Sequence, residues 1–392
     1  MKPMLIAIVG LPNKGKSTLF NALTSANAQV ASYPFTTINP NKGIAFASSP
    51  CPHVRINRQC DPHNAPCENG MRKIPVNVVD VAGLVEGAHE GKGMGNQFLS
   101  DISAADALVA VADASGGTDD EGNLCPPGTH EASRDVRILF DELDQWLAGV
   151  ITRNAKKSKG RGVSEFAAGL SGIKIGHEDL KKACLKLELD ETKFADWGKE
   201  EILQMARELR MAKPTLIAAN KVDSDHAEKN IAALKAAFPE HTVLSVAADA
   251  ELALKKAAEK KWINYDGREF KVTAENLDAR ITGALDRIDS HVLKKFGGTG
   301  VPQVAGECVF RLLDQIAVYP VEDDVHFSNH FGKVLPDAIL LKKGSTALQM
   351  AERIHTDLAT HFLYAVDAET KMRIGKDTPL HDGQIVKIVS AK

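Results

Sequence analysis

The chain has 392 residues, a formal net charge of −3, and 44% apolar and 25% charged residues. This length predicts two or three domains, because a single hydrophobic core rarely grows beyond about 250–300 residues. The balance of charge excludes a global basic field for nucleic acid, and no apolar stretch reaches the ~18 residues of a membrane span. Six scattered cysteines and the lack of a signal-peptide layout predict a cytoplasmic protein with reduced thiols.

The first patterned stretch lies near the start of the sequence. Residues 4–9 (MLIAIV) form an apolar run of strand length, and residues 10–17 (GLPNKGKS) follow with the phosphate-loop spacing G-x-x-x-x-G-K-S. Residues 18–23 then have the apolar spacing of a buried helical face. In such a loop the backbone N–H groups surround phosphate oxygens, Lys16 reaches the β- and γ-phosphates, and the Ser17 hydroxyl holds Mg²⁺. The sequence therefore predicts binding of a nucleoside triphosphate.

Two further stretches fit the same site. The loop at residues 33–43 (YPFTTINPNKG) is a turn-rich connector or, after a phosphate loop, a switch loop that places a Thr hydroxyl on Mg²⁺. Residues 74–81 predict a buried strand that ends in the tetrad DVAG, which runs from Asp80 to Gly83. We expect Asp80 to hold Mg²⁺ through water and the Gly83 N–H to approach the γ-phosphate.

The segment at residues 51–70 contains three cysteines and two histidines, which are Cys51, His53, Cys60, His63 and Cys67. Four such side chains are enough to enclose Zn²⁺. However, no C-x₂-C pair is present and the spacings match no common zinc module. The simpler interpretation is a Pro/Asn-rich excursion between two strands, and the sequence alone assigns no metal there.

The middle of the chain alternates strands and helices. Residues 106–114 predict a buried strand, and residues 116–129 predict an exposed loop that is rich in Gly, Pro, Asp and Asn. A block of helical segments at about 130–212 then interrupts the order of strands and is interpreted as an insertion. Residues 214–219 form the next predicted strand.

That strand leads into Asn220-Lys221-Val222-Asp223, which selects the base. An Asp carboxylate accepts hydrogen bonds from both the ring N–H and the exocyclic amine of guanine. Adenine offers no such pair of donors, so the preference is worth several kcal/mol, or about a thousandfold. The sequence therefore predicts GTP. A short strand at 243–248 precedes a loop at 245–249 in the base-contacting position, although its sequence SVAAD fits the usual pattern poorly.

The last third predicts a separate small domain. Helical segments at 251–258 and 273–296 precede a Gly-rich linker at 297–302. Strands and one helix follow, and their order predicts an α+β domain: strands at 317–321, 338–341, 363–366 and 384–389, with a helix at 346–361.

The stretches GLPNKGKSTLFNALT, YPFTTINPNKG and DVAGLVEGAHEGKGMGNQFL resemble the Obg family of GTPases, in its YchF-related branch. The segments LLKKGSTALQMAERIH and LHDGQIVKIV resemble a TGS domain. The resemblance implies an α/β P-loop NTPase fold (a G domain) at 1–300 with a helical insertion. A linker and a β-grasp TGS domain are implied at 301–392, with the core of the latter at about 315–390.

The resemblance also implies a role for each matching residue. Mg²⁺ would be held by Ser17, Thr37 and Asp80, and Lys16, Thr37, Gly83 and Asn13 would take part in hydrolysis. The remaining nucleotide contacts are implied for Asn13, Lys14, Gly15, Lys16, Ser17, Thr18, Phe35, Thr36 and Thr37 at the phosphates, and for Asn220, Lys221 and Asp223 at the base.

Two departures from related proteins affect the expected activity. YchF proteins proper carry a degenerate base motif and prefer ATP, whereas this chain keeps Asn-Lys-x-Asp and resembles the archaeal and fungal sister group. Leu84 occupies the position where Ras-type GTPases orient water with a Gln, so slow hydrolysis is expected. Some similar proteins use K⁺ held by a phosphate-loop Asn, here Asn13; otherwise Asn13 only shapes the loop.

The expected output is a GTP-operated switch, with contact to the ribosome or its RNA through the TGS domain and the helical insertion. The alternatives are an ATP-preferring regulatory NTPase of the stress-response type and a TGS domain that binds a small ligand. The sequence predicts no oligomeric state.

Overall fold

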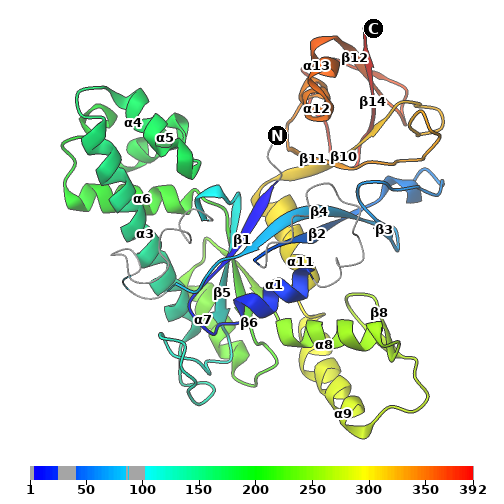
Figure 1. The fold of residues 1–392 in the computed structure, drawn as a ribbon, viewed down its shortest axis with the longest axis horizontal. Coiled ribbons are helices and arrows are strands. Elements are labelled where there is room, and N and C mark those ends of the chain that lie inside the picture. Colours follow the sequence, from blue (N-terminus) through cyan, green and yellow to red (C-terminus); the bar gives the residue numbers. More distant parts are fainter. Residues whose placement is uncertain (1–3, 25–40, 85–86, 88–101, 392) are drawn as a thin grey trace.

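The computed structural model describes residues 4–24, 41–84, 87 and 102–391. Within them, one sheet of seven strands organises the first domain and one of five strands organises the C-terminal domain. Figure 1 shows the two sheets with a helical lobe on the opposite side of the first domain from the C-terminal domain.

The first sheet has the strand order β2-β4-β1-β5-β6-β7, and β3 pairs with β4. In this order the strands β4, β1, β5, β6 and β7 run parallel, while β2 and β3 pair with β4 in the antiparallel sense. Their bounds are β1 (Leu5–Val9), β2 (Lys42–Pro50), β3 (Cys67–Glu68), β4 (Met71–Asp80), β5 (Ala107–Asp113), β6 (Thr215–Asn220) and β7 (Thr242–Ser245). Every residue of β5 and β6 is buried, as expected for parallel strands covered on both faces.

The alternation of side chains along β1 divides the core of this domain into two. Ala7 and Val9 pack in one apolar cluster with α3 (Ala132–Lys157) and α7 (Ala227–Ala237). Ile6 and Ile8 pack in the other cluster, with α1 (Lys16–Thr24) and α11 (Val301–Gly306). Helices therefore cover both faces of the sheet, and the carboxyl ends of the parallel strands meet at one edge.

The helix α3 belongs to two cores. Leu139 and Leu143 pack against the sheet, whereas Leu147 and Ile151, further along the helix, pack in the lobe. The predicted insertion at 130–212 includes all of this helix, although its first half packs against β5. The rest of the lobe consists of α4 (Val163–Leu170), α5 (His177–Leu187) and α6 (Lys199–Met211).

After β7 the chain passes through α8 (Ala248–Glu259) to a two-stranded hairpin that the sequence analysis missed, β8 (Ile263–Tyr265) and β9 (Phe270–Val272). The predicted long helix at 273–296 starts later, as α9 (Ala279–Ile288). It continues through a π-helical segment at Asp289–Leu293 into α10 (Lys294–Phe296).

The predicted linker at 297–302 ends in a packed helix. Helix α11 lies against α1 and β2, with Val301 and Val304 buried, and the π-helical segment Glu307–Leu312 that follows lies against β5 and β6. Residues 301–312 therefore pack with the first sheet. Crowding requires a glycine at position 300: Gly300 has φ +75°, and a Cβ there would collide with the Ser245 carbonyl oxygen.

The C-terminal domain has the four strands that the sequence predicts and a short fifth strand, β13, that it does not. The helix predicted at 346–361 is divided in two at His355. Its sheet has the order β11-β10-β14-β12-β13, and only the β10–β14 pair is parallel. Its elements are β10 (Gln315–Val321), β11 (Ile339–Lys342), α12 (Ala347–Ile354), α13 (Thr356–Thr360), β12 (Phe362–Asp367), β13 (Arg373–Ile374) and β14 (Ile385–Ser390). Met350 of α12 is fully buried against this sheet, as in a β-grasp fold.

Among the described residues, no helix is both long enough and apolar enough to cross a membrane.

Candidate nucleotide-binding site

The loop at residues 10–15 joins the carboxyl end of β1 to the N-terminus of α1 and depends on two glycines. Gly10 has φ +150°, and a Cβ there would lie 2.7 Å from the carbonyl oxygen of Val111. Gly15 has φ +91°, and a Cβ there would collide with the side-chain amide of Asn220. The G-x-x-x-x-G spacing thus fits the tight packing of this loop between β5 and the end of β6.

Lys16 and Gly83 lie close together at this edge. The Lys16 Nζ is buried and donates to the Leu11 carbonyl oxygen at 2.8 Å. A Cβ at position 83 would lie 3.1 Å from that Nζ, so Gly83 allows a close approach. Burial lowers the pKa of Lys16 to about 8, with Asp80 opposing and Lys14 adding to the shift. A polyanion bound here would supply the missing negative charge.

The carboxylate of Asp80 fits a Mg²⁺ site. One of its oxygens, Oδ1, is buried without a hydrogen-bond partner in the described part of the chain. Ser17 lies at the N-terminal turn of α1 and is exposed, while Thr18 next to it is half-buried. A buried carboxylate oxygen without a donor is a ligand that Mg²⁺ or one of its waters satisfies. The third predicted ligand, Thr37, lies outside the described residues, as do Phe35 and Thr36.

The tetrad at 220–223 is fastened to the phosphate loop. The Asn220 side chain donates to the Lys14 carbonyl oxygen at 3.2 Å and accepts from the Ala248 N–H at 3.2 Å. Lys221 donates to the Asn13 carbonyl oxygen at 3.1 Å. Asp223 is exposed on the turn that follows, and within the described residues its carboxylate makes no hydrogen bond or ion pair. Asn220 and Lys221 thus hold the phosphate loop, and Asp223 presents its carboxylate to solvent.

Lys14 and Asn13 have side-chain roles that the sequence did not indicate. Lys14 is fully buried, with its Nζ 2.8 Å from Asp135 Oδ1 and 2.9 Å from the Thr118 carbonyl oxygen. Its side chain is therefore a structural tether, and only its backbone N–H is left for phosphate. The Asn13 side chain donates to the Gly122 carbonyl oxygen at 2.9 Å. The loop at 116–129, predicted as simply exposed, thus folds back onto the phosphate loop.

Sequence analysis also missed Asp113, which is buried at the carboxyl end of β5. It accepts from Lys221 at 2.8 Å and from the Thr118 hydroxyl at 2.7 Å. Although burial opposes ionisation, Lys221, Ser115 and Thr118 together lower the pKa of this carboxyl. The position of Asp113, directly at the end of an apolar run, was a usable signal. Asp135 lies inside α3 and had none.

Two predictions about neighbouring positions can be compared with the structure. Leu84 is buried at 3% exposure, and its N–H donates to the Gly10 carbonyl oxygen at 3.2 Å. An apolar, packed side chain thus follows Gly83, as the sequence indicated. In the predicted base-contacting loop, α8 already begins at Ala248, and the Ala247 N–H donates to Thr299.

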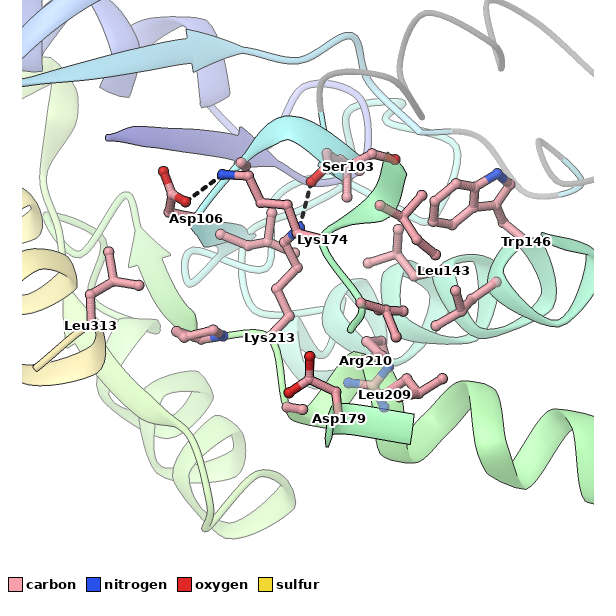
Figure 2. Close-up of a pocket in the computed structure, with 18 residues that line it drawn as sticks. Ser103, Asp106, Leu143, Trp146, Lys174, Asp179, Leu209, Arg210, Lys213 and Leu313 are labelled. Carbon is pink, nitrogen blue, oxygen red and sulfur yellow. Dashed lines mark hydrogen bonds and ion pairs between the residues drawn. The ribbon is translucent and has the colours of Figure 1, made fainter. Parts of the chain in front are cut away.

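A separate cavity of about 240 Å³ lies between the sheet and the helical lobe. Asp106 and Pro214, which precede β5 and β6, line it together with Trp146 and Leu147 of α3. Figure 2 shows Lys213 and Lys174 reaching into it, and Lys213 donates to the Ile102 carbonyl oxygen at 2.7 Å. Because it is lined from the amino ends of these strands, this cavity lies at the edge opposite the phosphate loop.

Three family descriptions match the chain. Residues 5–142 match "50S ribosome-binding GTPase", residues 218–323 match "Obg-like GTPase YGR210-like, G4 motif-containing domain", and residues 332–390 match "TGS domain".

Individual relatives cover the chain more completely. A GTP-binding protein of Methanocaldococcus jannaschii is 46% identical over 395 residues, which is 99% of each chain. A GTP-binding protein of Schizosaccharomyces pombe is 35% identical over 90% of each. The Obg-like ATPase 1 of Homo sapiens is 35% identical over 57% of this chain and 54% of that protein.

Solved structures agree with these relatives. The GTP-binding protein from Pyrococcus horikoshii superposes with a TM-score of 0.77 at 36% identity, covering 99% of this chain and 100% of that one. The YchF GTPase of Schizosaccharomyces pombe shares the fold, with a TM-score of 0.60 at 20% identity over 99% of this chain and 98% of that one.

Proposed function

The chain belongs to the Obg-like, YchF-type family of GTP-binding proteins, with a G domain and a TGS domain. From that premise we propose that it is a nucleotide switch that prefers GTP to ATP and hydrolyses GTP slowly. The observation that carries the proposal is the tetrad at 220–223. Its Asn and Lys are anchored on the phosphate loop, and its Asp223 carboxylate is exposed on the turn that follows.

In the proposed complex Asp223 accepts from the two donors on the guanine edge, while Lys16 pairs with the β- and γ-phosphates. The nucleotide thus spans from the turn after β6 to the N-terminus of α1. Mg²⁺, held by Ser17 and Asp80 together with Thr37, would bridge phosphate oxygens and neutralise charge that develops during transfer. The N-terminal backbone of α1 and the loop N–H groups from Asn13 to Thr18 complete the phosphate contacts.

A slow rate is proposed from the position after Gly83. Leu84 is buried and has no polar atom on its side chain, so it cannot orient the attacking water. The backbone N–H of Gly83 remains available for the γ-phosphate. Hydrolysis at the level of an unassisted GTPase follows, and a partner or a second cation would be needed to accelerate it.

K⁺ is the second cation that we propose, with Asn13 as its phosphate-loop ligand. A cation there would supply the positive charge that an arginine finger supplies elsewhere, which is worth ~10³–10⁵ in rate. Binding requires the Asn13 carboxamide to leave Gly122, to which it donates here. Turnover measured in K⁺ against Na⁺ tests this: equal rates, or an unchanged rate in Asn13→Ala, would exclude the role.

For the output of the switch we propose contact with the ribosome or its RNA in the cytoplasm, through the TGS domain and the helical lobe. The support is the matched family description at residues 5–142, which names 50S ribosome binding. Co-sedimentation with ribosomes in a non-hydrolysable GTP analogue, compared with GDP, is the test. No difference between the two nucleotide states would count against a ribosomal switch.

An ATP-preferring regulatory NTPase is the second candidate, because Obg-like ATPase 1 matches over part of the chain. Calorimetric affinities for GTP, GDP and ATP in Mg²⁺ separate the two. Tight GTP and GDP binding with ATP about a thousandfold weaker supports the proposal. Equal affinities would favour the ATPase.

A further inference from the structure

The segment between β2 and β4 brings together side chains that are far apart in sequence. Cys51, His53, Cys60 and Cys67 each offer one ligand atom, and these four atoms all lie within 4.8 Å of one another. The Nδ1 of His53 is 3.4 Å from Cys60 Sγ and 3.5 Å from Cys67 Sγ. In a tetrahedral zinc site with bonds of ~2.0–2.3 Å, neighbouring nitrogen and sulfur ligands are about 3.5 Å apart.

We propose that Cys51, His53, Cys60 and Cys67 bind one structural Zn²⁺ ion as a tetrahedral Cys₃His site. All of the cysteines are free rather than joined in disulfides. Each of the three thiols releases its proton to solvent as its S–Zn bond forms, and no oxidant or reductant is required. With four protein ligands the site is closed, so its role is structural rather than catalytic.

The backbone holds the four ligands from separate turns. Cys51 follows β2 and its N–H donates to the Gly70 carbonyl oxygen at 2.8 Å, which closes the excursion at its base. His53 lies in a 3₁₀ turn (Pro52–Val54), and Cys67 begins β3. The order C-x-H-x₆-C-x₆-C matches no common zinc module. The 3₁₀ turn and the hairpin of β3, rather than one compact zinc-binding loop, bring the four ligands together.

A buried arginine gives an independent reason for an anionic centre here. Arg72 is fully buried, and among the described residues no carboxylate lies within ion-pair distance of its guanidinium. Its donors reach Cys51 Sγ at 3.5 Å and the carbonyl oxygens of Ala65 at 3.2 Å and Leu335 at 2.8 Å, while its Nε has no partner.

Burying a charge without a counter-charge is costly. Zn²⁺ with three thiolates and a neutral imidazole has a net charge of −1. The proposed centre therefore supplies the counter-charge that Arg72 lacks.

The cluster lies where the two domains meet. Cys51 and Cys60 pack in one apolar cluster with Tyr319, Leu335 and Ile385 of the C-terminal domain. Next to the ligands, Asn64 makes two hydrogen bonds with the backbone of Ala338, at 3.0 and 2.9 Å. Figure 1 shows the ends of β2 and β4, with β3, beside the C-terminal domain. The ion would thus fix the surface on which the C-terminal domain docks.

His63 is the natural control within the same segment. It is one of the five side chains that the sequence offered as ligands, but it points away from the cluster. Its side chain is 74% exposed, and its Nδ1 lies 3.4 Å from Asp337 Oδ1. Cys184, buried in the helical lobe, controls for the loss of a cysteine elsewhere.

The experiment measures metal in the full chain, purified without chelators, by inductively coupled plasma mass spectrometry. We expect one zinc per chain in the wild type, in His63→Ala and in Cys184→Ala. In Cys60→Ala and Cys67→Ala the content should fall to about a tenth or less. Wild-type protein without stoichiometric zinc that also fails to take up added zinc would overturn the proposal, and so would cysteine variants that keep the wild-type content.

Cobalt provides a readout that does not depend on whether the variants fold. After chelation, wild-type protein titrated with Co²⁺ should show the intense visible bands of tetrahedral cobalt and a thiolate charge-transfer band, saturating at one equivalent. Octahedral cobalt, or no thiolate band, would overturn the site. Chelated protein should also become more sensitive to proteolysis near residue 313, while its GDP affinity stays unchanged. Unchanged proteolysis would overturn the interdomain role.

Discussion

Strand β4 has a charged residue near each end, Arg72 at its start and Asp80 at its finish, and the two regions around them differ in how the sequence specifies them. Near the carboxyl end of β4 lies the phosphate loop that follows β1. Its residues are consecutive in the sequence, so their spacing alone was enough to predict it. At the other end, four ligands from a 17-residue stretch meet through turns. Eight steps along the strand separate the two by roughly 26 Å. We therefore expect changes at either end to leave the other intact.

The largest expected effect is at the base motif. Asp223→Asn replaces a double acceptor with a side chain that presents amide donors to the guanine donors, so the preference for GTP over ATP should fall by about a thousandfold. Calorimetry with both nucleotides measures it, and zinc content should stay at the wild-type value. Asp225→Asn, on the same exposed turn, is the matched control and should keep the preference. A preserved preference in Asp223→Asn would refute base reading by this carboxylate.

Next comes Lys16→Ala, which removes the ammonium group that we place on the β- and γ-phosphates. Losing one such stabilising donor should lower the single-turnover hydrolysis rate about 10²–10³-fold. Lys73→Ala, which removes an ammonium group from β4 that donates to Ser48 Oγ at 3.1 Å, should leave the rate unchanged. If Lys16→Ala also lost its zinc, the nucleotide site and the zinc site would be coupled through the fold, contrary to the independence expected above.

At the other end, Arg72→Met should weaken zinc binding by about 10–100-fold, as for other partners that surround a metal centre. Arg72→Lys keeps the positive charge and should recover part of the affinity. Competition with a chelating indicator measures both variants. Equal zinc affinity in Arg72→Met and the wild type would show that the guanidinium does not balance the centre.

The smallest expected effect is a pH dependence confined to the nucleotide end. Burial lowers the pKa of Lys16 from 10.5 to about 8. In free protein Lys16 is then mostly charged at pH 7 and mostly neutral at pH 9, so GTP affinity should fall about tenfold across this interval. Lys16→Ala should lack this slope.

The same shift has the opposite sign for folding. Between pH about 8 and 10.5 the unfolded chain binds more protons at this lysine than the folded one, so its contribution to stability increases with pH in that window.

A GTP affinity that stays flat from pH 7 to 9 would show that phosphate binding does not require this proton.

Much of the first domain follows from short-range patterns. The apolar runs at 4–9, 106–114 and 214–219 correspond to β1, β5 and β6, because parallel strands covered on both faces need continuous apolar sequence. Four of the five C-terminal strands were predicted equally well, and the two-residue strand β13 was missed. The glycines at 297–300 were interpreted as a flexible linker. Gly300 is instead required because the Ser245 carbonyl oxygen approaches it closely.

The sequence could not predict which residues that are far apart along the chain contact each other in the fold. The partner of Lys14 is Asp135, more than a hundred residues away, and nothing in the helix pattern around Asp135 marks it. The same holds for the contact of Asn13 with Gly122. For the thiol cluster, the residue types were visible, but the choice of His53 over His63 needed the fold.

Helix α3 has a mechanical consequence. Its 26 residues form one rod of roughly 39 Å that is rooted in the first domain and emerges in the lobe. Near its middle, Glu142 accepts from the N–H of Gly87, just beyond the DVAG tetrad, at 2.6 Å. A pivot of about 5° at that point would swing the far tip by about 2 Å. Helix α3 therefore joins the segment beyond the DVAG tetrad to the helical lobe as one continuous element, so a displacement of either would be carried to the other.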